Sequence, residues 1–201
     1  MRIALSVAFL LIASPLAGQR RAPPVGPRLC SSSDSSYFHG TGLADREGWY
    51  GKHLRAMQEP ALCAKPGVEV YRFLWLRTFH NPIAVRIQRL DDHYRLTGKQ
   101  LSGAGGYEPG KLVRDTTIEL SAEQVVQVKD LIDQSGYWSM AADSSFGYDG
   151  SQWILEVVSD GGYRVVDRWT PGYDGKRSTY RTLCLRMVAL SGLTPDSTWI
   201  Y

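Results

Sequence analysis

The fold of this chain is decided by one apolar stretch, Val68-Glu69-Val70-Tyr71-Arg72-Phe73-Leu74-Trp75-Leu76-Arg77-Thr78-Phe79. Its large side chains recur with a period of two. Tyr71, Phe73, Trp75 and Phe79 share one face, and Val70, Leu74 and Leu76 share the other. A period of two is the pattern of a β-strand, and apolar side chains on both faces are typical of a strand covered on both sides. The stretch therefore predicts a central strand with protein packed against both faces.

Three further strands are predicted directly after it. Asn81-Pro82 marks a turn, and residues 83–88 and 93–97 then alternate apolar and polar side chains. A glycine-rich loop at 103–110 is followed by residues 112–120, which are rich in Thr and Val. Such residues favour strands, so the region predicts four consecutive strands.

Helices are predicted at three places: residues 44–58, 121–136 and 178–191. The second begins with Ser121 and Gln124, whose spacing is that of a capping box. Each segment has an apolar stripe at helical spacing, made by Tyr50, Leu54 and Met57, then by Val125, Val128, Leu131 and Ile132, and last by Tyr180, Leu183, Cys184, Met187 and Val188.

A hairpin is predicted between the last two helices. Residues 153–158 and 163–169 flank the turn residues Ser159-Asp160-Gly161-Gly162. The order is then helix, four strands, helix, two strands, helix, and runs of consecutive strands favour an antiparallel sheet. We therefore expect a single α+β domain over residues 44–201, with a sheet of about six strands, two main helices packed on it and a short N-terminal helix.

The first 18 residues have the three parts of a secretory signal. Arg2 supplies the positive charge, residues 3–13 the apolar run, and residues 14–18 the small residues before a cleavage site after Ala17 or Gly18. The alternative is an apolar N-terminal helix that is never cleaved. The run is too short to span a bilayer, and Gln19 stands where a lipid-anchored protein has Cys. We expect an exported protein, periplasmic or extracellular, with no transmembrane segment in the mature chain.

Residues 19–43 are rich in Pro and Ser and are interpreted as a linker or arm. The chain has a formal net charge of +3, and removal of residues 1–18 takes away only Arg2 among its charged side chains. A charge this close to balance gives no nucleic-acid footprint, so nucleic acid is not expected as a partner.

The chain has three cysteines, Cys30, Cys63 and Cys184. Cys184 lies on the apolar face of the last predicted helix and is interpreted as a buried small side chain. Because exported compartments favour disulfides, we predict a Cys30–Cys63 bridge, which closes a loop of about 33 residues and stabilises by about 3 kcal/mol. The alternative is two free thiols in loops.

No motif for a cofactor or a metal is visible. Gly105 to Lys111 match the spacing of a phosphate-binding loop, but Leu112 replaces the Ser or Thr that holds Mg²⁺, and a strand rather than a helix follows. The four histidines, His39, His53, His80 and His93, have no metal-ligand spacing. We therefore expect neither a cofactor nor a metal.

Four residues are candidates for catalysis: His80, Arg77, Glu156 and Asp167. All are polar residues within or at the end of apolar strands, where a buried charge must be paired. One interpretation is a structural network, with Arg77 paired to Glu156 or Asp167. The other is a polar site on the sheet with Glu156 as acid or base.

The segment 141–151 is a candidate ligand loop, because it is long, polar and aromatic. Its candidate residues are Asp143, Tyr148 and Asp149. It lacks the alternating acidic positions of a calcium loop and the glycine spacing of a nucleophile elbow.

Several strings together are similar to a group of uncharacterised exported or hypothetical bacterial proteins. They are Trp49-Tyr50-Gly51-Lys52-His53-Leu54-Arg55-Ala56-Met57, Tyr71-Arg72-Phe73-Leu74-Trp75-Leu76-Arg77-Thr78-Phe79-His80-Asn81-Pro82, Asp149-Gly150-Ser151-Gln152-Trp153-Ile154-Leu155-Glu156 and Val166-Asp167-Arg168-Trp169. The resemblance spans residues 48–192. It implies export but no activity, ligand or catalytic residue.

Three kinds of function remain open. The first is a non-enzymatic envelope or periplasmic protein that binds a protein or a small ligand through one sheet face or the 141–151 loop. The second is a small hydrolase or lyase that uses the four catalytic candidates. The third is an inhibitor or immunity-type protein with an exposed aromatic patch.

Overall fold

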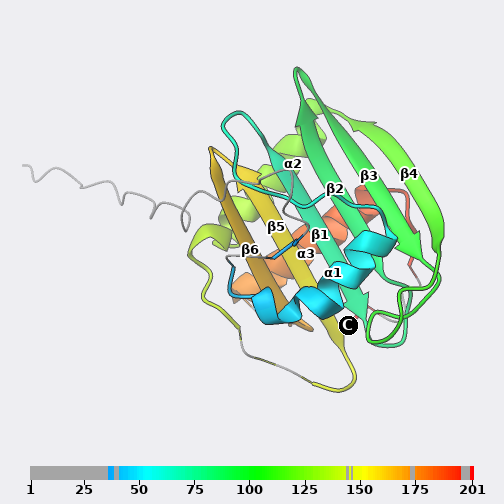
Figure 1. Cartoon of the computed structure of the whole chain (residues 1–201). Coiled ribbons are helices and arrows are strands. Elements are labelled where there is room, and N and C mark those ends of the chain that lie inside the picture. The colour runs from blue at the N-terminus through cyan, green and yellow to red at the C-terminus, as the bar shows by residue number, and fades with distance from the viewer. Residues whose placement is uncertain (1–35, 39–40, 144, 146, 173–174, 196–199) are drawn as a thin grey trace, which may run out of the picture.

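The computed structural model describes residues 36–38, 41–143, 145, 147–172, 175–195 and 200–201. The order of elements is the one that the sequence predicts (Figure 1). They are η1 (Ala44–Arg46), α1 (Glu47–Ala56), β1 (Val70–Arg77), β2 (Ile83–Leu90), β3 (His93–Leu101), β4 (Leu112–Leu120), α2 (Ala122–Gln134), η2 (Tyr137–Ser139), β5 (Ser151–Ser159), β6 (Gly162–Trp169) and α3 (Gly175–Leu190).

The six strands form one antiparallel sheet in the order β4-β3-β2-β1-β5-β6. This confirms the predicted α+β class. Strands β1 to β4 follow one another outward, and the chain then passes through α2 and returns as β5 on the other side of β1. Strand β1 is therefore central, and β4 and β6 are the two edges (Figure 1).

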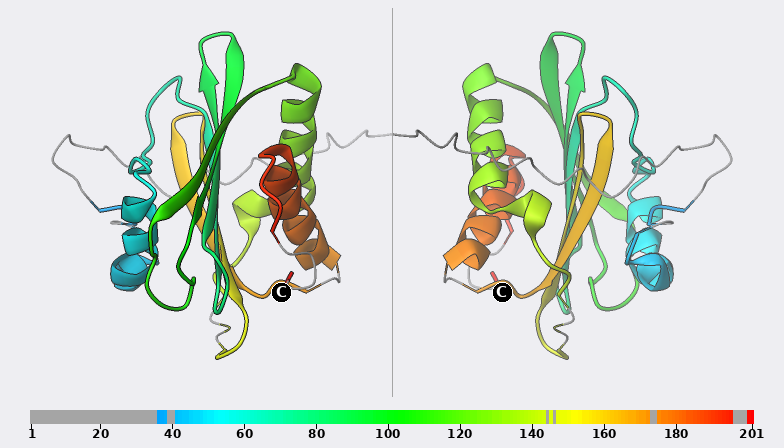
Figure 2. Two further views of the ribbon diagram at one scale, coloured as in Figure 1. Left: turned by 90° about the vertical axis from the view of Figure 1, so that its right-hand side faces the viewer. Right: turned by 90° about the vertical axis from the view of Figure 1, so that its left-hand side faces the viewer.

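Helices cover both faces of the sheet. Figure 2 shows α2 and α3 on one face and α1 on the other. All eight residues of β1 are buried, as its two apolar faces predict. Trp75 and Trp153, on neighbouring strands, pack with ring centroids 4.9 Å apart beneath α3. The sheet is thus the middle of three layers.

The predicted helix stripes form the core on the two faces. Helix α2 begins with the predicted capping box between Ser121 and Gln124. The stripe of α3 is buried against the sheet, and Cys184 on it is a buried free cysteine, as its position in the pattern predicts. On the opposite face the α1 stripe packs together with Tyr37 and Phe38, which belong to the end of the expected arm. This end of the arm therefore contributes to the core.

Three expectations lie wholly or mostly outside the described residues: the signal segment 1–18, the arm over residues 19–43, and Cys30. The sulfur of Cys63 is engaged in a disulfide, but no bridge joins two cysteines within the described part of the chain. The Cys30–Cys63 pairing therefore stays a prediction. In the portion that the structure covers, none of the helices has the length and apolar character that crossing a bilayer requires.

Candidate binding groove

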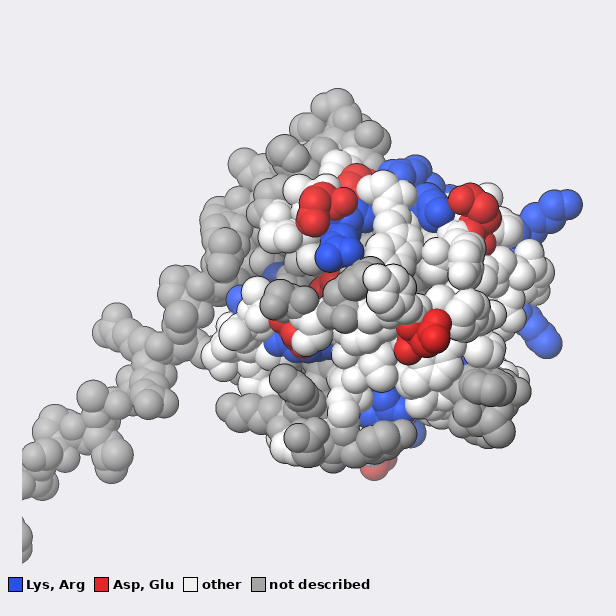
Figure 3. Space-filling view, turned by 90° about the horizontal axis from the view of Figure 1, so that it is seen from below, with Lys and Arg blue, Asp and Glu red and all other residues white. Residues whose placement is uncertain are grey.

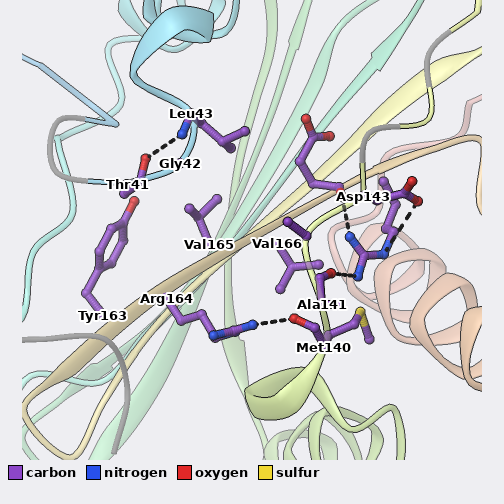
Figure 4. Close-up of a pocket in the computed structure, with 13 residues that line it drawn as sticks. Thr41, Gly42, Leu43, Met140, Ala141, Asp143, Tyr163, Arg164, Val165 and Val166 are labelled. Atoms are coloured by element: carbon purple, nitrogen blue, oxygen red, sulfur yellow. Dashed lines mark hydrogen bonds and ion pairs between the residues drawn. The ribbon is translucent and has the colours of Figure 1, made fainter.

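A cavity of about 360 Å³ lies along the outer edge of β6 (Figure 4). Three chain segments line it: residues 41–43, residues 140–143 and β6 residues 163–168. We call this cavity the β6 groove. Its floor is the edge of the sheet, and its two walls come from opposite faces of the sheet.

The β5–β6 hairpin determines which backbone groups of β6 face the groove. Its turn consists of Asp160 and Gly161, with φ of 52° and 73°, the values of a type I′ turn. In a hairpin of this type the residues that flank the turn exchange hydrogen bonds, and every second residue after them does the same. The residues between them, Tyr163, Val165 and Asp167, direct their N–H and C=O groups away from β5 and into the groove.

These outward groups are largely unpaired. The carbonyl of Asp167 accepts a 2.7 Å hydrogen bond from Nη1 of Arg168, which closes that end of the edge. Within the described part of the chain, the outward N–H and C=O groups of Tyr163 and Val165 have no hydrogen-bond partner. An edge of this kind is a template for a further strand.

Two arginines of β6 hold the wall formed by residues 140–143. Arg164 donates from Nε to the carbonyl of Tyr137 at 3.1 Å and from Nη2 to the carbonyl of Met140. Arg168 donates to the carbonyl of Ala141 and lies 3.9 Å from Oδ2 of Asp143. The loop after η2 is thereby fixed beside the sheet edge.

The opposite wall is a short turn before η1. Oγ1 of Thr41 donates to the carbonyl of Phe38 at 2.6 Å, and the N–H of Leu43 donates back to the same Oγ1 at 3.1 Å. Because Phe38 is buried under α1, this turn is anchored to the core. Figure 4 shows Leu43 and Val165 on one side of the groove and Met140 and Val166 on the other, so both walls have apolar side chains.

Asp167 is the one catalytic candidate that lines the groove. The hydroxyl of Tyr50 donates to its Oδ2 at 2.8 Å, and its Oδ1 is buried without a hydrogen-bond partner among the described residues. Burial raises the pKa of the Asp167 carboxyl to about 6, although the bond from Tyr50 works in the opposite direction. Asp167 is therefore a weakly acidic group at the base of the wall formed by residues 41–43.

The other three catalytic candidates have partners elsewhere. Glu156 is fully buried and pairs with Arg72, not with Arg77. The reason is register, because Arg72 stands directly opposite Glu156 in the sheet, whereas Arg77 stands opposite Ser151. The structural network proposed from the sequence therefore exists with a different arginine.

Arg77 and His80 lie at the end of β1. The guanidinium of Arg77 stacks 4.5 Å from the centroid of the Trp75 ring and donates to the carbonyl of Asn81. Nδ1 of His80 is 2.8 Å from the hydroxyl of Tyr201. Neither residue lines the groove.

Only the beginning of the candidate ligand loop belongs to the groove. Asp143 lines it and pairs with Arg168. Tyr148 is 90% exposed, and Asp149 is also exposed, but neither is a lining residue.

Sequence reasoning did not identify Tyr50, Arg164 or the segment 41–43 as site residues. One signal was available for Arg164: it shares a strand face with Val166 and Arg168, and two cations beside a buried apolar residue indicate an edge or a site. The segment 41–43 carries no such signal, because only the tertiary fold brings it to β6.

The face of the molecule that Figure 3 shows carries no field of one sign among its described residues. Figure 3, which views the molecule from below, shows acidic and basic side chains interspersed among uncharged ones on that face. Within the residues that the structure covers, no three His, Cys, Asp or Glu side chains are grouped so that they could hold a metal ion.

In comparisons with known proteins, the chain matches no family model, no curated protein and no solved structure. The resemblance to uncharacterised exported proteins therefore stays an expectation.

Proposed function

We propose that this chain is an exported binding protein that takes an extended peptide segment of a partner protein into the β6 groove, where the segment adds a strand to the sheet. The observation that carries the proposal is the floor of the groove, where the outward N–H and C=O groups of Val165 have no partner among the described residues. Strand addition at a sheet edge is a recurring mode of peptide recognition, in which main-chain hydrogen bonds supply affinity.

The shape of the groove supports an extended peptide. The lining part of β6, residues 163–168, is about 17 Å long at the rise of a β-strand, which matches about five peptide residues. Side chains of a strand point alternately to opposite faces, so those of the added segment meet the two walls in turn. The volume would also admit a small molecule, since such sites begin at about 300 Å³. A peptide backbone, however, matches the outward donors and acceptors of Tyr163 and Val165 on the floor.

The hydrolase alternative receives less support. Its acid–base candidate, Glu156, has no exposed surface, and its carboxylate oxygens already accept bonds from Arg72 at 2.7 Å and Tyr163 at 2.7 Å. A carboxylate held in this way is occupied by structural contacts, and its removal would leave an uncompensated buried charge.

Export rests on the signal-like N-terminus, and we propose that the partner is a protein of the envelope. N-terminal sequencing of protein purified from its native envelope should begin at Gly18 or Gln19. An N-terminus at Met1 would contradict export by a cleaved signal.

The test of the groove is a selection from a displayed library of random peptides of about seven residues, long enough to span the edge. The full mature protein is the target. We expect binders that are lost on Val165→Pro, because proline removes an outward donor and is tolerated where an edge N–H faces solvent. The matched control is Thr117→Pro, which removes an outward donor from the opposite edge strand, β4.

A second variant tests the groove without depending on whether the Val165→Pro variant folds. Ala142 is exposed and lines the groove, so Ala142→Trp should fill the groove without altering β6. Binders that resist both variants, or a library without binders, would overturn the proposal. If a small molecule binds the parent and the Val165→Pro variant but not the Ala142→Trp variant, the ligand of the groove is that small molecule and not a peptide.

A further inference from the structure

One groove-lining cation lacks an acidic partner. Arg164 makes no ion pair in the described part of the chain, and its two hydrogen bonds go to the carbonyls of Tyr137 and Met140 through Nε and Nη2. Nη1 is not used in either bond. Arg168, by contrast, is buried and has the carboxylate of Asp143 nearby. The groove therefore carries one guanidinium, partly exposed, whose charge is not balanced.

From this imbalance we infer that the segment bound in the β6 groove carries an acidic side chain directly opposite Arg164. The inference rests on the proposed strand addition. In an added strand, the residue opposite Arg164 presents its side chain on the same face of the sheet, with Cβ atoms about 5 Å apart. An arginine fork binds a carboxylate with two parallel hydrogen bonds, which a neutral or basic side chain cannot match.

The neighbours of the acidic residue follow from the same register. The next residue lies opposite Val165 and faces the wall that contains Leu43, and the one after it lies opposite Val166 on the face of Arg164. Both positions therefore favour apolar side chains. An antiparallel segment would read apolar, apolar, acidic from its N-terminus, and a parallel segment would read acidic, apolar, apolar.

A second acidic residue is disfavoured at the other end. The position opposite Asp167 meets a carboxyl that is already partly desolvated, and like charges directly opposite one another in a sheet are destabilising. The ligand class is therefore an extended apolar segment with a single carboxylate toward the turn end of β6.

The library selection described above reads out this preference. We expect Asp or Glu to be enriched at one position beside two apolar residues. A soluble peptide from that selection is then compared with its Gln and Lys counterparts by titration calorimetry. The Gln peptide should bind about tenfold more weakly, which corresponds to about 1.4 kcal/mol.

Charge reversal gives the decisive comparison. Arg164→Glu should weaken the acidic peptide and strengthen the Lys peptide, whereas Arg114→Glu, an exposed position of β4 with the same change in net charge, should affect neither. If Arg164→Glu weakens the binding of the acidic peptide and of the Gln peptide equally, the inference is overturned. Arg164 would then act only by holding the wall formed by residues 140–143. Binders that depend on Val165 but show no preference for acid would overturn it while leaving the proposed function intact.

Discussion

Nη2 of Arg72 lies 2.6 Å from Oε2 of Glu156, and both side chains are completely buried between the sheet and the segment that follows α1. Glu59 lies 3.9 Å from Nη1 of the same arginine, and the hydroxyl of Tyr163 donates to Oε1 of Glu156 at 2.7 Å. Burial works against both charges, but the attraction of Glu156 raises the pKa of Arg72 and keeps it protonated. The pair joins β1 to β5, at the junction between the run of strands β1 to β4 and the β5–β6 hairpin.

Loss of one member of this pair should be costly. Glu156→Gln leaves a buried guanidinium without its closest counter-charge, so we expect the free energy of unfolding to fall by about 3–5 kcal/mol. Urea unfolding at neutral pH measures the change. The control is Glu119→Gln, which breaks the exposed pair with Arg95 and should cost less than about 1 kcal/mol. Similar small losses in both variants would contradict a structural role for Glu156.

The sequence predicts the elements of this fold far better than it predicts their contacts. The period of two in β1 and the stripes of α2 and α3 are local patterns that reflect burial, and the structure confirms them. The partner of Glu156 is decided by the register between β1 and β5, which are more than seventy residues apart in the chain. Alternation reveals which face a side chain occupies but not which residue stands opposite it in the next strand. The sequence therefore does not distinguish Arg72 from Arg77 as the partner of Glu156.

The sequence does not predict the β6 groove, for a related reason. Its walls are irregular segments, residues 41–43 and 140–143, and irregular segments carry no periodicity that would place them. The sequence indicates both Asp143 and Asp167 as candidate site residues, but only the position of β6 at the edge of the sheet brings them to one site. Edge position depends on strand order, which local patterns do not determine.

A buried histidine should make the protein sensitive to acid. His53 on α1 is fully buried, and neither ring nitrogen has a hydrogen-bond partner among the described residues. Burial, with a smaller effect from the charge of Lys52, lowers the pKa of His53 to about 4. Because the folded state binds this proton less readily than the unfolded state, the contribution of the neutral His53 to stability is fully present above pH 6.5 and is lost as the pH falls toward 4.

His53→Leu removes that penalty. Relative to the parent, the variant should gain about 2 kcal/mol in unfolding free energy between pH 7 and pH 5, because the unfolded parent takes up a proton on His53 in this range and the variant has no group there to do so. Urea unfolding of both proteins across this range measures the gain. A constant difference between the two proteins across this range would contradict a lowered pKa of His53 in the folded state.

The cysteines give a chemical test of the region before β1. Mass spectrometry without reduction should find one Cys30–Cys63 disulfide, and iodoacetamide should not label Cys184 until the protein is unfolded. Burial raises the pKa of the Cys184 thiol well above its usual value, so the reactive thiolate is scarce. Removing the bridge by Cys63→Ser should cost about 3 kcal/mol on the chain-entropy account. Labelling of three thiols in the native protein would contradict both assignments.

Asp167 should produce the opposite pH dependence to His53. Burial raises its pKa from 3.8 to about 6, so the folded state binds the proton more readily than the unfolded state. The contribution of Asp167 to stability is therefore fully present below pH 3.8 and is lost as the pH rises toward 6. Asp167→Asn has no such decline, and its unfolding free energy relative to the parent should increase by about 2 kcal/mol between pH 4 and pH 7.

Tyr50 supplies the control for this group. Its hydroxyl donates to Oδ2 of Asp167 and so favours the charged carboxylate. Tyr50→Phe should therefore move the decline in stability to higher pH, which NMR titration of the Asp167 carboxyl would follow independently of unfolding. If Asp167→Asn and the parent keep parallel pH profiles, the carboxyl is hydrated in solution. The wall formed by residues 41–43 would then stand open more widely than the 2.8 Å contact with Tyr50 implies.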